Sequence, residues 1–567
     1  MTLPEDPKEA QKVFNSLPIK NQLDIVLKVR GKERLHYLFL SEHSEELVQQ
    51  LPELEVFLTV KEIGERDSLE LISLTTPEQF LYLLDLDFWK RDQLDPEKIL
   101  NWMEILLESG EKKVTQFIQS TDPEFIALLL KKFLHVTTLE REHLEGMDRI
   151  PLFTLDQFYF VDFKGKKTGE VFEPFLRILY RIKGEGYRKL MESLVCEIEP
   201  ELEEAGYRLR NSRLSDYGFP DFEESLEIYH FVNPESLILE ERPLKVRAQE
   251  EIEKGSSIFY LTHQNEGPFF SSILSKIDDP HEQDRLKQEI TALCNKAIVA
   301  EAIDLSNIAA MERVVKKVYH TLNLGLQYLS KGDEIKAFEI LQSLPIQRLF
   351  QCGVGTTLLL RKKAESILKG TWFLDDQENL VFLDPPHFEK FEGILRKRPA
   401  FYRDWIYEDF KNLQDLKEAD AFLEFIEVII DFLGRGLNVS PRYLKELDLS
   451  GFPEEWREIT LSTIFFTSLA NQILRGTFQF EAIKQGQVKD FLYRVFESDA
   501  QGKGVIKMEV KNGLRDWYYS IEGEEIKRQH LLAFQDFCLD LFEEEYGKIP
   551  PEEKVDPRFV KGLLIRK

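Results

Sequence analysis

Hydrophobic residues along the first quarter of the chain recur at the three- and four-residue spacing of one helix face. The clearest case follows Asp95, where the apolar positions are Ile99, Trp102, Met103, Leu106 and Leu107. Side chains with this spacing lie on one side of an α-helix, so the segment predicts an amphipathic helix that buries a single stripe. Gly110 follows the last apolar position, at a place where glycine commonly ends a helix.

The predicted helices of this region start in the same way. Thr76, Asp95 and Asp122 are each followed by Pro and Glu. A Thr or Asp side chain accepts a hydrogen bond from a backbone N–H at the helix start, Pro fits the first helical position, and Glu interacts favourably with the helix dipole. We therefore predict that all three residues are helix N-caps. Short helices that are restarted so often must stack on their neighbours, which predicts a superhelical array over residues 17–136.

Beyond residue 146, helical stretches are interrupted by short segments in which aromatic residues alternate with other residues. Alternation of this kind predicts β-strands. We predict one β-hairpin within residues 151–172 that turns at Lys164–Lys166, and another across Asn512-Gly513, a favoured hairpin turn. Residues 256–263 and 371–386 are two further strand candidates.

The remaining sequence has mostly helical patterns. Residues 459–474 form the most apolar uncharged run, but it contains Thr, Ser, Asn and Gln and is short for a membrane span. We predict a buried helix there, with Gly476 just past its end. Residues 324–341 predict a tight pair of helices with Gly332 in the turn.

The predicted fold class is mainly α, with an N-terminal superhelical array of short helices followed by α-rich domains with small β-hairpin insertions. A chain of 567 residues is long enough for several domains. We divide it into a helical-repeat domain (1–146), a mixed segment of helices and β-hairpins (147–282), a helical-hairpin domain (283–386) and a C-terminal α-rich domain (387–567).

Composition restricts the partners and the compartment. The formal net charge of −27 would repel a phosphate backbone, so we expect no nucleic-acid partner. The four cysteines have neither metal-ligand nor redox spacing, which suits a reducing compartment. The N-terminal segment is acidic and has no apolar signal core. We expect a cytoplasmic protein without membrane insertion.

No catalytic or metal motif is found, and we expect neither a metal nor a cofactor. The ten histidines are scattered, and residues 352–357, CGVGTT, lack the lysine of a phosphate-binding loop.

One polar segment, residues 207–225, holds the candidate ligand-binding residues Arg208, Arg210, Arg213 and Asp216. The arginines could bind a carboxylate or phosphate in a bidentate manner, or they could fix a loop to acidic residues of the chain itself, with Asp216 as a ready partner. We expect Arg210 and Arg213 to be partly buried and one of them to be paired with a carboxylate.

Two resemblances accompany these patterns. The stretches LPELEVFLTVKEIGERDSLELISLTTPEQFLYLLDL and TDPEFIALLLKKF are similar to the cytosolic N-terminal helical domain of MgtE-type magnesium transporters, which implies a run of short helices. The transporter's membrane domain has no counterpart here, so transport is not implied. The whole chain resembles an uncharacterised family of large bacterial proteins, through RLRNSRLSDYGFPDFEESLEIY, LCNKAIVAEAIDLSN and ITLSTIFFTSLANQIL.

These observations favour a non-catalytic interaction or regulatory scaffold that binds a protein partner, because stacked helices offer extended surfaces and no catalytic set is found. An enzyme or small-anion sensor with a site around Arg208–Asp221 is the alternative. A divalent-cation sensor, suggested by the acidic N-terminal helices and the transporter resemblance, is the third hypothesis.

Overall fold

The computed structural model describes residues 6–90, 93–138, 153–239, 266–305, 307–369, 382–437, 439, 441–446, 459–498, 503–520, 525–547 and 562–566. Helices dominate these residues, and the strands form only small two-stranded sheets, which confirms the mainly α fold class. Within these ranges, no helix combines the length and the apolar character needed to cross a membrane. The chain forms two compact units, residues 1–230 with 238–351 and residues 231–237 with 352–567. The division into four domains stays a prediction.

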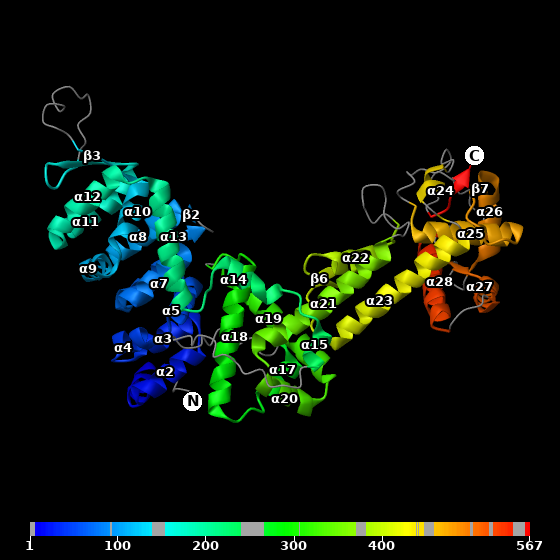
Figure 1. The fold of residues 1–567 in the computed structure, drawn as a ribbon, viewed down its shortest axis with the longest axis horizontal. Coiled ribbons are helices and arrows are strands. Elements are labelled where there is room, and N and C mark those ends of the chain that lie inside the picture. Colours follow the sequence, from blue (N-terminus) through cyan, green and yellow to red (C-terminus); the bar gives the residue numbers. More distant parts are fainter. Residues whose placement is uncertain are drawn as a thin grey trace, which may run out of the picture. The chain divides into compact units, whose positions relative to one another are not determined.

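The first unit begins with ten short helices (Figure 1). They are α1 (Pro7–Asn15), α2 (Ile19–Lys28), α3 (Gly31–Leu40), α4 (Ser44–Gln50), α5 (Glu53–Ile63), α6 (Leu69–Leu74), α7 (Pro77–Asp87), α8 (Pro96–Glu108), α9 (Glu111–Ser120) and α10 (Pro123–Phe133). Odd-numbered helices from α1 to α9 pack in succession on one another, and α2, α4 and α6 do the same. Helices α1 to α5 and α7 therefore each pack against the second helix after them.

The predicted N-caps are confirmed. The carboxylate of Asp95 accepts hydrogen bonds from the backbone N–H of Glu97 (3.0 Å) and of Lys98 (3.3 Å), and Asp122 caps α10 in the same way. Thr76 forms a reciprocal capping box with Gln79 at the start of α7.

Later helices of the first unit follow a small antiparallel sheet. The elements are β1 (Trp89–Lys90), β2 (Gln93–Leu94), β3 (Leu134–Thr138), β4 (Tyr159–Phe163), α11 (Lys166–Ile182), α12 (Gly184–Cys196), α13 (Glu199–Asp216), α14 (Phe222–Leu226), α17 (Pro268–Leu274), α18 (Pro280–Ala300), α19 (Ile308–Ser330) and α20 (Glu334–Ser343). Strand β4 pairs with β3, with Val161 opposite Val136.

The hairpin predicted at Lys164–Lys166 is wrong. The aromatic strand 159–163 exists, but its partner precedes it by more than twenty residues, and α11 begins at Lys166. Val171, Phe172 and Phe175 then face the core at helical spacing, so the helix continues through the rest of the predicted hairpin.

The predicted helical hairpin at 324–341 is confirmed. Helices α19 and α20 pack together, and Lys331 and Gly332 make the turn between them with positive φ angles of 54° and 79°. Ala337 is fully buried, which lets the two helices approach closely.

The second unit is also helical. The chain passes between the units three times: after residue 230, after residue 237 within α15 (Pro234–Leu239), and after residue 351 within α21 (Ile346–Leu368). The other elements are α22 (His387–Leu395), β5 (Phe401–Arg403), β6 (Ile406–Glu408), α23 (Leu413–Asp431), α24 (Pro441–Glu446), α25 (Leu461–Arg475), β7 (Ile483–Lys484), α26 (Val488–Val495), β8 (Phe496–Ser498), β9 (Gly504–Ile506), α27 (Met508–Ser520), α28 (Glu525–Tyr546) and β10 (Ile565–Arg566).

The apolar run at 459–474 forms the buried helix α25, which ends at Gly476 in the left-handed conformation, as predicted. The hairpin across Asn512-Gly513 is wrong, because both residues lie on an exposed face of α27, and β9 pairs instead with the preceding strand β8. The strand candidate 256–263 lies outside the described residues. Of the candidate at 371–386, only residues 382–386 are described, and they do not form a strand.

Candidate functional site

The four residues singled out in the sequence lie on helix α13 rather than in a loop. Arg210 and Arg213 are three positions apart and therefore share one face, which packs toward α7 and α10. Arg208 lies on a more exposed side of the helix, and Asp216 is the exposed last residue of α13. The structure thus brings Arg210 and Arg213 together and leaves the other two apart from them.

Arg213 forms a bidentate ion pair with Asp85 of helix α7. Its Nε and Nη2 atoms both lie 2.7 Å from the carboxylate oxygens, and the Asp85 side chain is only 2% exposed. Arg210 donates from Nε to the backbone carbonyl of Asp85, and its guanidinium lies 5.8 Å from the rings of Trp89 and Tyr207. This confirms the expected burial and the pairing with a carboxylate, although the partner is Asp85 and not Asp216.

Electrostatics around Asp85 reflect this burial. Loss of solvent raises the pKa of the Asp85 carboxyl, and the hydrogen bonds and charge of Arg213 oppose that rise. Burial also lowers the pKa of the Arg210 guanidinium, against the influence of Asp85. Arg208 pairs with Glu204 one helical turn away, where its side chain is 76% exposed. All three guanidinium groups therefore already have a partner within the chain.

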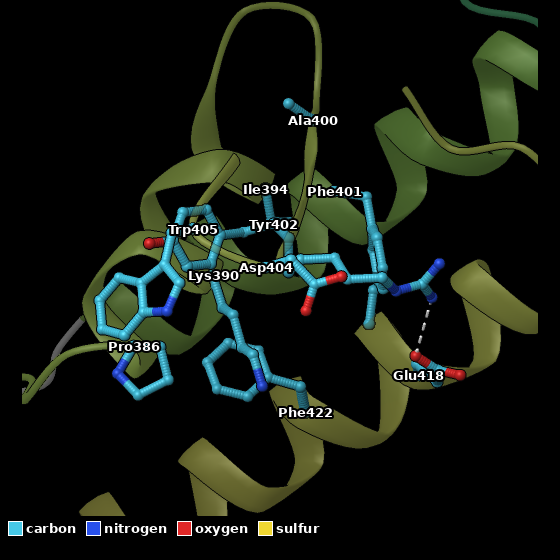
Figure 2. A pocket seen from close by; sticks show the side chains of 12 residues that line it. Pro386, Lys390, Ile394, Ala400, Phe401, Tyr402, Asp404, Trp405, Glu418 and Phe422 are labelled. Atoms are coloured by element: carbon cyan, nitrogen blue, oxygen red, sulfur yellow. Dashed lines mark hydrogen bonds and ion pairs between the residues drawn. The ribbon is translucent and has the colours of Figure 1, made fainter. Parts of the chain in front are cut away.

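A cleft in the second unit is a stronger candidate for ligand binding. It has a cavity volume of about 390 Å³ and lies among α22, the β5–β6 hairpin and α23 (Figure 2). Aromatic side chains form much of its wall, namely Phe401, Tyr402, Trp405 and Phe422. Ligand sites commonly combine such apolar walls with a few polar groups.

The hairpin turn at the cleft has an unusual conformation. Asp404 and Trp405 form a two-residue turn between Arg403 and Ile406, and both have positive φ angles, 51° and 65°. Turns of this type favour Asn-Gly, because a side chain in the left-handed region costs roughly 1–2 kcal/mol. Trp405 is nevertheless 75% exposed and Ile406 is 65% exposed. A bulky aromatic residue therefore occupies a strained position in which it gains little burial.

The charged residues of the cleft differ in their pairing. Arg403 lies 3.0 Å from the buried carboxylate of Asp415 and 3.3 Å from that of Glu418, the second contact being drawn as a dashed line in Figure 2. Lys390 extends toward Phe422, with its ammonium 5.8 Å from the ring centroid. No carboxylate of the described residues lies within 4.0 Å of this ammonium.

His387 contacts Phe422, one of the residues that line the cleft. Its ring lies against Phe422, with centroids 5.9 Å apart, and against Phe537, at 4.4 Å. Burial lowers the pKa of the imidazole to about 4, and the positive charge of Lys390 adds to this effect. The imidazole is therefore neutral near pH 7, and Lys390 carries the positive charge on this side of the cleft.

Sequence analysis missed this cleft. FYRDWIYE contains a signal, since two aromatic-rich segments flank Asp404-Trp405, but the turn has no glycine and the alternation is short. That Lys390 has no carboxylate partner in the described part of the chain has no local signature, because it depends on which side chains α23 and the hairpin bring near.

Comparison with known proteins adds a family and no activity. No curated protein and no solved structure matches the chain significantly. A family model described as a family of unknown function, DUF6178, matches residues 11–566. Since that match covers nearly the whole sequence, the chain belongs to the family of unknown function DUF6178.

Proposed function

We propose that this protein is a non-catalytic interaction protein, a regulatory scaffold that binds a partner protein at the cleft beside Trp405. The observation that carries the proposal is the exposure of Trp405 in a left-handed turn at the rim of an aromatic cleft. A location in the cytoplasm and the lack of nucleic-acid partners are part of the proposal and rest on composition and charge.

The energetics of Trp405 support this proposal. A tryptophan buries on the order of 150–250 Å² when it is covered, and the hydrophobic gain is about 25 cal/mol per Å². In the isolated chain most of this gain is not realised, and the left-handed backbone adds a cost. Strained backbone positions and exposed tryptophans are both enriched where a protein meets a ligand or partner. Contact with a partner would recover the missing burial.

The alternatives have less support. A small-anion sensor or enzyme around Arg208–Asp221 would need free guanidinium groups, but Arg213 binds Asp85 and Arg208 binds Glu204. For a divalent-cation sensor, three or more acidic or imidazole side chains should converge, and the described part of the chain has no such group. The likeness of the N-terminal helices to MgtE-type transporters stays an interpretation of the sequence.

Affinity purification with matched variants tests the proposal. The bait proteins are the wild type, Trp405→Gly and a control, Ile335→Ser, which alters a residue of α20 that is 74% exposed. We expect one protein to be captured at low salt by the wild type and by the control but not by Trp405→Gly. Once purified, that partner should bind Trp405→Gly at least about tenfold more weakly, a loss of about 1.4 kcal/mol.

Stability measurements separate lost binding from lost folding. Glycine relieves the left-handed strain at position 405 but has a more flexible unfolded state, and these effects nearly cancel. Trp405→Gly should thus keep the thermal midpoint of the wild type. If purified partners bind Trp405→Gly and the wild type equally, the cleft is not the docking site and the proposal fails.

A further inference from the structure

We infer that the cleft recognises a segment of the partner in which a large apolar side chain stands next to a carboxylate. This inference rests on the proposed function and specifies the chemistry of the bound segment. It follows from the ammonium of Lys390, which pairs with no carboxylate of the described residues, from the pairing of Arg403 with Asp415 and Glu418, and from the aromatic walls of the cavity.

Three other cations near the cleft have a carboxylate partner within the chain. Arg396 pairs with Glu392, Lys411 pairs with Glu408, and Arg403 pairs with Asp415. The chain has 101 acidic residues against 74 basic ones, so cations generally find a carboxylate nearby. Lys390 is half-buried in a cleft and has none within ion-pair distance among the described residues. An anion brought by a partner would complete this pair.

The acidic residues of the cleft itself are poorly placed to pair with the ammonium of Lys390. Glu418 is bonded to Arg403, and Asp404 is exposed in the turn, where water screens its charge. Arg403 lies 4.6 Å from the ring of Phe401 but is paired with Asp415 and Glu418, so the cation of the cleft that remains for an added anion is Lys390. A charge-assisted hydrogen bond in such a place is stronger than one formed in open solvent.

The rest of the cavity suits an apolar group. Its volume of about 390 Å³ has room for one aromatic side chain, and Ile394 adds an aliphatic surface to the aromatic wall. Rings at the rim, above all Trp405, can pack against an inserted side chain. Because this apolar space adjoins the ammonium of Lys390, the complementary group is an apolar side chain with a neighbouring carboxylate.

Capped dipeptides test this inference in the full-length protein by isothermal titration calorimetry. The probes are N-acetyl-Phe-Asp-amide, N-acetyl-Phe-Asn-amide and N-acetyl-Phe-Lys-amide, which share the aromatic group and differ in charge. We expect the Asp peptide to bind about tenfold more tightly than the Asn peptide, and the Lys peptide to bind most weakly. The advantage of the Asp peptide should shrink as salt is added.

Variants of the cleft make the result specific. Lys390→Met should remove the preference for Asp over Asn, while Lys397→Met, which changes an exposed lysine outside the cleft, should keep it. Asp404→Asn should strengthen binding of the Asp peptide. Trp405→Gly should weaken the binding of the Asp peptide and of the Asn peptide by the same factor.

The outcomes distinguish the inference from the function on which it rests. If the wild type binds the Asp and Asn peptides equally and Trp405→Gly binds neither, carboxylate recognition is overturned. The docking function would then still stand. Binding that ignores Trp405, or no binding of any probe at millimolar concentration, would overturn both. A preference for Asp that survives Lys390→Met would also overturn the inference, because another group would then hold the carboxylate.

Discussion

Individual residues in the first unit hold distant segments together through buried charges. Arg213 and Asp85 are 128 positions apart, yet they form a bidentate pair between α13 and α7. Arg34 and Glu55 form another pair at 2.8 Å, with side chains only 2% and 3% exposed. Such pairs contribute little net stability compared with apolar contacts, but removing one partner leaves an uncompensated buried charge. A packing of these helices that separated the two partners would therefore be disfavoured.

Arg213→Ala should destabilise the first unit strongly. Asp85 would remain buried without its guanidinium partner, which typically lowers the free energy of unfolding by about 3–5 kcal/mol. Urea denaturation followed by circular dichroism measures the change. Arg208→Ala is the matched control, because its ion pair is exposed and should contribute less than about 1 kcal/mol. Equal effects of the two substitutions would contradict this account, and Arg213→Met with Asp85→Leu should cost less than the sum of the single changes.

His387 should make the stability of the second unit depend on pH. Its pKa is about 4 in the folded protein, below the usual value of 6.5, so the unfolded chain binds a proton at a higher pH than the folded protein does. Stability is therefore fully present above pH 6.5 and decreases as the pH falls from 6.5 toward 4, by about 3 kcal/mol at most. Thermal melting of the wild type and His387→Phe over this range isolates the effect. Parallel pH profiles of the two proteins would refute it.

At the scale of elements, helix starts were predictable and strand partners were not. A cap such as Asp95 acts on N–H groups two and three residues away, so its sequence signature is local. Strand β4 pairs with β3, more than twenty residues earlier, and a local pattern cannot specify such a partner. Asn512-Gly513 failed as a turn signal because α27 places both residues on its exposed face, where they are tolerated at a modest cost.

Asp95→Ala should lower the free energy of unfolding of the first unit by about 1 kcal/mol, because two N–H groups at the start of α8 lose their acceptor. Asp95→Asn keeps an acceptor and should be nearly neutral. Asp221 provides a control, since it occupies the N-cap position of α14 without making a side-chain cap hydrogen bond. Denaturation midpoints that fall equally for Asp95→Ala and Asp221→Ala would show that capping is not the cause.

For the whole molecule, the mainly α class followed from hydrophobic spacing that extends over most of the chain. The candidate site did not follow, since its features are relations between elements. The partner of Arg213 lies on α7, and Lys390 is distinctive only because α23 and the hairpin bring no carboxylate to it. Sequence alone identified the guanidinium groups as a cluster but could not show that each already has a partner.

Overall charge gives a prediction for the intact chain. With a net charge of −27, the protein should bind duplex DNA no better than other acidic proteins do, because few phosphate contacts can form and release counterions. Fluorescence anisotropy with a random duplex at about 150 mM salt measures this. Submicromolar, salt-sensitive binding would contradict it and would require a segregated basic surface.

The stacking order of the N-terminal helices has a kinetic consequence. Because α1 to α5 and α7 each pack on the second helix after them, their contacts are short-range in sequence, and low contact order favours rapid folding. Helix α13 docks onto α7 and α10 across a much longer loop, so this closure should come late on the folding pathway. Interactions formed after the transition state slow unfolding more than they speed folding. The pair between Arg213 and Asp85 would then mainly slow the unfolding of the first unit. The N-caps of the early helices would mainly affect its folding rate.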